Sequence, residues 1–153
     1  MWPWFSVLVA ISLALPALAQ PSQQAKPDWI ADPVNGCRVW NPYPLPNESI
    51  RWSRQCPDGT LQGHGVLEWF KDGKLTERTE GDFRDGKLNG WGTYRKADGS
   101  RYDGVFQNGR PHGQGKAVYR DGSVYEGAWN NGCWQEGNRR GAMFATEEEC
   151  ERR

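Results

Sequence analysis

Short stretches of alternating apolar and polar residues recur between residues 52 and 137, separated by Asp-Gly or Asn-Gly dipeptides. In one of them, Tyr102, Gly104 and Phe106 fall on the same face of an extended strand, and Asp103 falls on the opposite face. An Asp-Gly or Asn-Gly pair between two such stretches is the strongest local signal for a tight turn that joins antiparallel strands. The pattern therefore predicts a series of β-hairpins.

These hairpin signals return with a period of 23 residues. Gly86, Gly109 and Gly132 stand at equivalent positions, and Gly92 and Gly115 have the same spacing. A fixed period of this size is typical of stacked repeats, because a single hairpin cannot bury its own apolar face. We expect an all-β fold in which the hairpins form one elongated, single-layer antiparallel sheet.

The repeating unit resembles a known family. Residues 102–124, and the unit that begins at residue 125, follow the pattern Tyr-Asp/Glu-Gly-x-Phe/Trp-x-x-Gly, and the first of them continues with Gly-x-Gly. This pattern resembles the MORN repeat, and the resemblance covers residues 52 to about 137. The flanking segments, 37–69 and 131–150, resemble the opening and closing segments of exported bacterial MORN-repeat proteins, which implies a periplasmic location.

Aromatic residues recur at fixed positions of the repeat and are expected to form a stripe across the strands. Phe83, Phe106 and Trp129 belong to one row, and Tyr102 and Tyr125 to another. The stripe has two interpretations: it is the core of the sheet, covered by the terminal segments, or it is a shallow groove for an extended ligand. The candidate binding residues are Trp69, Phe83, Trp91, Tyr94, Tyr102, Phe106, Tyr119, Tyr125 and Trp129.

The chain begins with the features of a secretion signal. Residues 2–19 contain no charged side chain and end in Ala17-Leu18-Ala19, which predicts cleavage after Ala19. The apolar run is nearly long enough to cross a bilayer, so an uncleaved anchor is the alternative. Residues 20–28 are expected to be a flexible leader.

Non-repeat caps are expected at both ends of the hairpin region. Residues 29–51 are rich in aromatic residues and proline, which favours an extended flap packed on the sheet. Residues 138–153 contain Thr146 followed by Glu149, a helix-capping pattern that predicts a short terminal helix.

Four cysteines follow the signal, and an even number in an exported chain indicates disulfides. Three pairings are possible. The local pairs Cys37–Cys56 and Cys133–Cys150 are favoured because each closes a short loop at one end of the repeats. A zinc site would need ligand pairs two to four residues apart, and the cysteines have no such spacing. We therefore expect no metal.

The charge balance and the histidines limit the possible functions. Acidic and basic residues number 19 each, so the basic excess typical of nucleic-acid binding is missing. His64 and His112 both precede a glycine in a turn region, and no Ser, Cys or Asp stands in a recognisable nucleophile context. We expect neither an enzyme nor a cofactor.

The expected function is that of a non-catalytic interaction or scaffold protein, which binds a protein partner in the periplasm or cell envelope. One alternative is an envelope glycan that stacks on the aromatic stripe. Another follows from the family resemblance, because MORN repeats have been linked to anionic phospholipid surfaces; the zero net charge argues against membrane contact. Open sheet edges also predict self-association.

Overall fold

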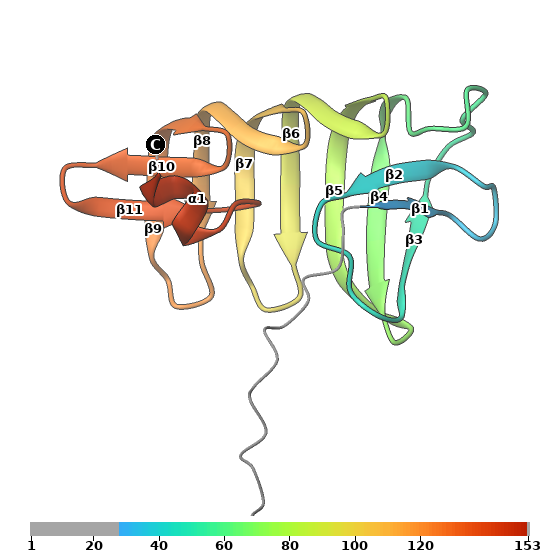
Figure 1. Cartoon of the computed structure of the whole chain (residues 1–153), viewed down its shortest axis with the longest axis horizontal. Helices are drawn as coiled ribbons and strands as arrows, with labels where there is room; N and C mark the ends of the chain where they lie inside the picture. Colours follow the sequence, from blue (N-terminus) through green and yellow to red (C-terminus); the bar gives the residue numbers. More distant parts are fainter. Residues whose placement is uncertain (1–27, 153) are drawn as a thin grey trace, which may run out of the picture.

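Nine antiparallel strands, hydrogen-bonded in the order of the sequence, form the main sheet of the computed structural model, which describes residues 28–152 (Figure 1). A separate pair, β1 and β2, precedes it, and one short helix follows it. The elements are β1 Asp28–Ala31, β2 Arg38–Asn41, β3 Glu48–Trp52, β4 Gly63–Lys71, β5 Lys74–Arg84, β6 Lys87–Lys96, β7 Arg101–Gln107, β8 Arg110–Val118, β9 Val124–Asn130, β10 Cys133–Glu136, β11 Arg139–Ala142 and α1 Glu147–Glu151. The predicted all-β stack of antiparallel hairpins is confirmed.

Some of the expected segments fall outside the described part of the chain. The signal, residues 1–19, and residues 20–27 of the leader lie there. The main sheet itself runs from Glu48 to Ala142, so it takes in the end of the segment expected to be the N-terminal cap and the start of the C-terminal one. Among the described residues, no helix has the length and apolar character needed to cross a membrane.

The predicted tight turns join consecutive strands. Asp85 and Gly86 connect β5 to β6 with φ angles of 50° and 70°, and Asn108 and Gly109 connect β7 to β8 with 51° and 82°. Positive φ at both central residues defines the type I′ turn, whose twist matches that of the flanking strands. Asp and Asn tolerate this conformation better than other side chains and glycine adopts it without strain, which explains the recurring dipeptide.

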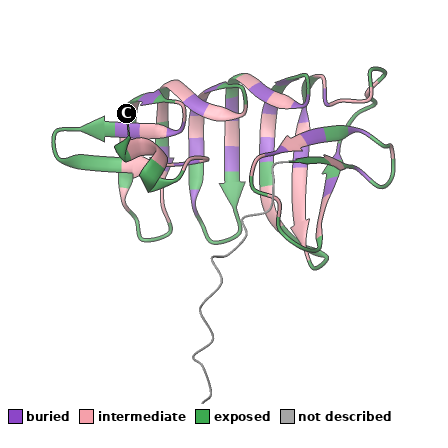
Figure 2. Ribbon diagram, in the orientation of Figure 1, coloured by how far each residue is buried: buried purple, intermediate pink, exposed green. Residues whose placement is uncertain are grey.

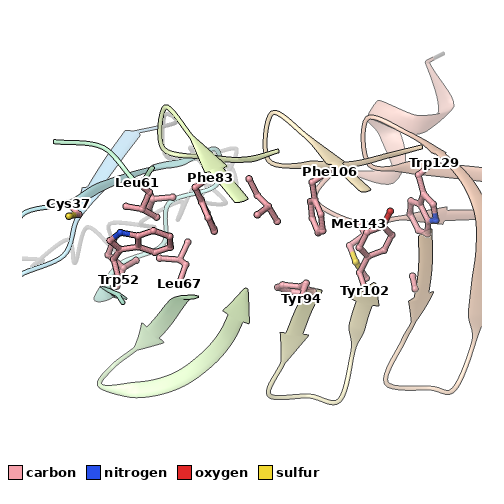
Figure 3. Packing of buried hydrophobic residues seen from close by; sticks show 14 of the residues in the cluster. Cys37, Trp52, Leu61, Leu67, Phe83, Tyr94, Tyr102, Phe106, Trp129 and Met143 are labelled. Atoms are coloured by element: carbon pink, nitrogen blue, oxygen red, sulfur yellow. The ribbon is translucent and has the colours of Figure 1, made fainter. Parts of the chain in front are cut away.

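One face of the sheet carries the core. Phe83, Phe106 and Trp129 lie in one row across the strands, and Tyr94 and Tyr102 lie beside it (Figure 3). All five are buried, and buried and exposed positions alternate along the strands (Figure 2). The strand pattern thus places the aromatic row on the covered face, as the period of two requires.

Glycines on this face leave room for the aromatic rings. The ring of Tyr102 lies over Gly115, where a Cβ atom would collide with it, and the ring of Trp52 lies over Gly65 in the same way. Gly65 and Gly115 thus let aromatic rings lie directly over the backbone of the sheet.

The N-terminal cap, residues 28–47, lies across the first strands of the sheet (Figure 1). A disulfide between Cys37 and Cys56 ties it to the loop between β3 and β4. The Asp32 carboxylate is buried and accepts a hydrogen bond from the backbone N–H of Trp52, at 2.7 Å. Further hydrogen bonds, such as that from the backbone N–H of Trp40 to the Gly86 carbonyl at 3.1 Å, add to this covalent link and buried contact.

The C-terminal cap, residues 143–152, contains the predicted helix. Thr146 is its N-cap: the Thr146 hydroxyl accepts from the backbone N–H of Glu149 at 3.1 Å, and the Glu149 carboxylate accepts from the N–H of Thr146 at 2.7 Å. This reciprocal pair is a capping box, which satisfies two backbone donors that would otherwise lack partners. The predicted Cys133–Cys150 disulfide joins the helix to β10.

Candidate functional site

A cavity of about 420 Å³ lies on the covered face of the sheet, between the two caps. Its floor consists of apolar side chains from β4 to β7, namely Leu67, Phe83, Leu88 and Phe106. Residues 39–43 and Leu45 of the N-terminal cap form one wall, and Met143 and Phe144 of the C-terminal segment form the other. We call this cavity the groove.

The groove lies where the two caps approach each other over the middle of the sheet without filling the space between them. In Figure 1, β1 and β2 cross one end and α1 lies over the other, while β6 and β7 are visible between them. The edge-to-face contact between Phe144 and Tyr94, with ring centroids 4.7 Å apart, brings the C-terminal segment down onto β6. The floor residues are buried, with exposed fractions of 2–5%, so the apolar surface that the groove exposes comes mainly from Trp69 of β4 and from Trp40, Leu45 and Phe144 of the caps.

A three-residue cluster connects the two caps at the rim of the groove. Arg110 of β8 donates hydrogen bonds to the Tyr43 hydroxyl at 2.9 Å and to the Glu149 carboxylate at 3.1 Å. The Tyr43 hydroxyl in turn donates to Glu149 at 2.9 Å. Segments that lie 106 residues apart in the sequence therefore meet here.

The cluster shifts the proton affinity of its members. The pKa of Glu149 is lowered to about 2, first by the backbone N–H of Thr146 and then by Tyr43 and Arg110. Burial raises the pKa of Tyr43, and the neighbouring Glu149 carboxylate adds to this effect. At neutral pH Glu149 is an anion held between a neutral phenol and a guanidinium.

Two carboxylates lie at one end of the groove, toward the start of β3 and of β5. Glu77 is paired in register with Trp69 of β4, on the same face. Glu48 accepts hydrogen bonds from the Asn41 amide and from the backbone N–H of Leu45, both at 2.9 Å. We call Glu48, Glu77 and Trp69 the acidic end of the groove.

Burial sets the protonation behaviour of this end. It raises the pKa of Glu77, while the Tyr94 hydroxyl and the Lys96 ammonium act in the opposite direction. The pKa of Tyr94 is raised strongly, first by burial and then by the charge of Glu77. Both groups thus sit in surroundings that disfavour a charge with no partner.

A basic side chain lies at the other end. Lys87 begins β6 and lines the groove, and its ammonium is 5.6 Å from the centre of the Trp40 ring. In the strand register, Glu77 stands opposite Lys96 at one end of the β5–β6 hairpin, whereas Lys87 stands opposite Arg84 at the other. The groove therefore has opposite charge at its two ends.

The structure divides the aromatic stripe into four groups. Four of the candidate residues line the groove, two are buried beside it, two are partly buried beneath the last hairpin, and one is exposed on the opposite face. In this order they are Trp69, Phe83, Tyr94 and Phe106; Tyr102 and Trp129; Tyr119 and Tyr125; and Trp91.

The opposite face of the sheet, which we call the outer face, is charged. Arg95 and Asp103 form an ion pair at 2.7 Å across β6 and β7, and Lys116 and Glu126 form one at 2.8 Å across β8 and β9. Trp91 is 61% exposed and stands among these polar strands. Ion pairs of this kind are typical of a hydrated surface.

Several residues of the groove were not among the sequence-based candidates. Glu48, Glu77 and Lys87 are charged, and Trp40 and Phe144 belong to the caps. A signal for Glu77 exists in the sequence: it shares the alternation of Thr79, Gly81 and Phe83, and a charged residue at a core-facing position is unusual. For the cap residues the sequence carries no such signal, because their position depends on long-range packing.

The histidines and cysteines give no indication of catalysis. His64 is exposed and lies 3.3 Å from the Asp82 carboxylate, and His112 accepts a hydrogen bond from the backbone N–H of Asn131 at 3.3 Å. The four cysteines form the two predicted disulfides. Across residues 28–152, no group of three or more His, Cys, Asp or Glu side chains is placed to hold a metal ion.

Comparison with known families identifies the repeats. The sequence model of the MORN repeat matches residues 80–101 and 102–124, which are the units in the centre of the sheet. No curated protein matches the chain. MORN repeats are non-catalytic modules that generally mediate interactions with proteins or membranes. The matched units and the stacked hairpins agree, and residues 80–124 are two MORN repeats within the sheet.

Proposed function

We propose that this chain is a non-catalytic interaction protein of the periplasm or cell envelope, which binds an extended segment of a protein partner in the groove. The observation that carries the proposal is the groove itself, an open cavity over the central repeats that is bounded by both caps. A volume of about 420 Å³ is within the range of specific ligand sites and accommodates a few side chains of a partner segment.

The contrast between the two faces favours the groove over the outer face. Leu45, Trp40 and Trp69 line the groove with fully or partly exposed apolar surface, and burying such surface is the main source of affinity in most protein complexes. On the outer face, the Arg95–Asp103 pair would have to be desolvated before a partner could bind. A partner segment therefore gains more in the groove.

An exported location is supported by the two disulfides. Cystines persist in oxidising compartments and are rare in the cytosol, where thiols are kept reduced. The secretion signal expected at residues 1–19 points in the same direction. Both observations fit a protein that meets its partner outside the cytosol.

Photocrosslinking tests the proposal with matched positions. A photoreactive amino acid replaces Leu45, which lines the groove and is 58% exposed, or Trp91, which is similarly exposed on the outer face. We expect irradiation of intact envelopes to join a discrete protein to the Leu45 position and not to the Trp91 position. Crosslinking from Trp91 alone, or from neither position, would contradict the proposal.

An envelope glycan is the second candidate, and the groove contains an observation that favours it. Trp40 and Trp69 both line the cavity, and tryptophan rings are suited to stack on sugars. Titration of the folded protein with peptidoglycan fragments, followed by tryptophan fluorescence, distinguishes this candidate. A saturable shift in emission that is lost in Trp69→Ala but kept in Trp91→Ala would favour the glycan over the protein segment.

A further inference from the structure

The acidic end of the groove holds two carboxylates without a cationic partner. Within the described residues, neither Glu48 nor Glu77 has an ion pair within 4.0 Å. The hydrogen bonds to Glu48 come from neutral donors, the Asn41 amide and the Leu45 backbone. The negative charge at this end is therefore not neutralised by a charge-assisted hydrogen bond from a Lys or Arg side chain of the described residues.

The lysines nearest to these carboxylates are engaged elsewhere. Lys96, which pairs with Glu77 in register, lies 3.4 Å from the Asp98 carboxylate. Lys71, which pairs with Glu48 in register, donates to the Pro46 carbonyl and lies 3.9 Å from Asp72. Each ammonium thus has its own aspartate, and the two glutamates remain for a ligand.

The surroundings of Glu77 increase the attraction for a cation. Trp69 is the cross-strand neighbour of Glu77, and Tyr94 is close enough to change its pKa. An aromatic face attracts a cation, and a partly buried carboxylate binds one more strongly than an exposed carboxylate does. Ring and carboxylate together match the two parts of a lysine or arginine side chain, an apolar stem and a charged head.

The charges at the far end specify a direction. Lys87 there lines the groove, whereas the charge of Arg110 at the rim is balanced by its ion pair with Glu149. A basic side chain at that end would meet like charge, whereas at the acidic end it meets opposite charge. Charge complementarity therefore favours one of the two orientations for a segment with a single basic residue.

We propose that the groove binds an extended partner segment by a lysine or arginine side chain that inserts between Trp69 and Glu77, at the acidic end. This inference rests on the proposed function, because it names the chemistry of the segment that the groove holds. The apolar residues of the segment pack against the exposed or partly exposed side chains of the groove walls, Trp40, Leu45 and Phe144.

A selection with short random peptides tests this inference on the disulfide-bonded exported chain. The selected peptides are sorted by whether they crosslink to the photoreactive group at position 45, which identifies those in the groove. We expect the groove-bound peptides to be enriched in lysine or arginine beside apolar residues. Glu77→Gln should weaken their binding by about tenfold to a hundredfold, the range of a hydrogen bond to a charged group.

Two controls separate a binding effect from a folding effect. Glu80→Gln removes a carboxylate of β5 that pairs with Arg78 instead, and it should leave the affinity unchanged. Replacing the basic residue of a selected peptide by norleucine should cause the same loss as Glu77→Gln, with the protein itself unaltered. Groove-bound peptides without a basic residue, or with equal affinity for Glu77→Gln, would overturn the inference and leave the proposed function standing. Failure to find any peptide that crosslinks at position 45 would contradict both.

Discussion

The two faces of the nine-stranded sheet are built from the same hairpins and have opposite chemistry. On the covered face, the rings of Phe83, Phe106 and Trp129 form a row whose ends are sealed by the two caps. On the outer face, cross-strand ion pairs such as Lys116–Glu126 stand in solvent. Alternation along each strand separates the two sets, because neighbouring side chains point to opposite faces.

This difference shows how a single-layer sheet becomes stable. Stacked repeats bury apolar area only against their neighbours within the layer, so one face needs a cover that the repeats themselves cannot supply. The caps supply it at the ends, and each is fixed by a cystine, Cys37–Cys56 or Cys133–Cys150. The groove lies between the caps and is lined by residues of both.

The sharpest test of the comparison uses the same substitution on both faces. Trp129→Ala removes a ring that is 3% exposed and packs edge-to-face on Tyr102 at 5.4 Å, so we expect a loss of about 3–5 kcal/mol in unfolding free energy. Trp91→Ala removes a ring that is 61% exposed, and the loss should stay within about 1 kcal/mol. Urea denaturation measures both. Comparable losses for the two variants would mean that the outer face is also covered.

Removal of either cystine should have the next largest effect. Each closes a short loop, with sequence separations of 19 and 17, and the chain-entropy model gives about 3 kcal/mol for such loops. We expect Cys37→Ala with Cys56→Ala to cost more than Cys133→Ala with Cys150→Ala, because Cys37 is fully buried and its loss also leaves a cavity. Thermal unfolding of the two double variants checks the order, and the reverse order would show that the C-terminal cap contributes more to the covered face.

Local signals were sufficient to predict the repeats but not the groove. The 23-residue period and the Asp-Gly and Asn-Gly pairs predicted the hairpins, and the alternation around Tyr102 correctly predicted a shared face with Phe106. The side on which Trp91 lies was not assigned, because it depends on the register of neighbouring strands. That register shifts at a bulge beside Gly81, which the local sequence does not reveal.

The walls of the groove could not be predicted from local sequence signals, for a different reason. Tyr43 and Glu149 meet through a hydrogen bond although they are 106 residues apart, and no period connects the caps to the repeats. The terminal helix was predictable, because Thr146 and Glu149 are close in sequence. Its placement over the sheet follows from tertiary packing and from the Cys133–Cys150 bond.

A smaller effect concerns the groove, where the free energy of unfolding should depend on pH through Glu77. Burial raises the pKa of Glu77 above its ordinary value of 4.5, so this carboxyl binds its proton more tightly in the folded protein than in the unfolded chain. The stability from this group is present below pH 4.5 and is lost as the pH rises through the folded-state pKa. We therefore expect Glu77→Gln to be more stable than the wild type at neutral pH, by less than the losses above, and the difference to vanish in acid.

Glu149 provides the control of opposite sign. Its pKa is lowered to about 2, so its stabilising contribution is present above pH 4.5 and disappears as the pH falls toward 2. Glu149→Gln should thus be less stable than the wild type at neutral pH. Urea unfolding of both variants over a pH series measures the two trends. A Glu77→Gln variant that is destabilised at neutral pH would show that the carboxylate has a stabilising partner within the folded chain.

The smallest expected effect concerns the ion pairs of the outer face. Lys116 and Glu126 stand opposite each other in register, with side chains 50% and 65% exposed, so a double-mutant cycle with Lys116→Met and Glu126→Gln should give a coupling below about 1 kcal/mol. Salt should reduce it further, because exposed charges are screened. A larger coupling that persists in high salt would require this pair to be shielded from solvent. The outer face would then be an interface as well, and the contrast between an open, hydrated face and a covered one would hold only for the isolated chain.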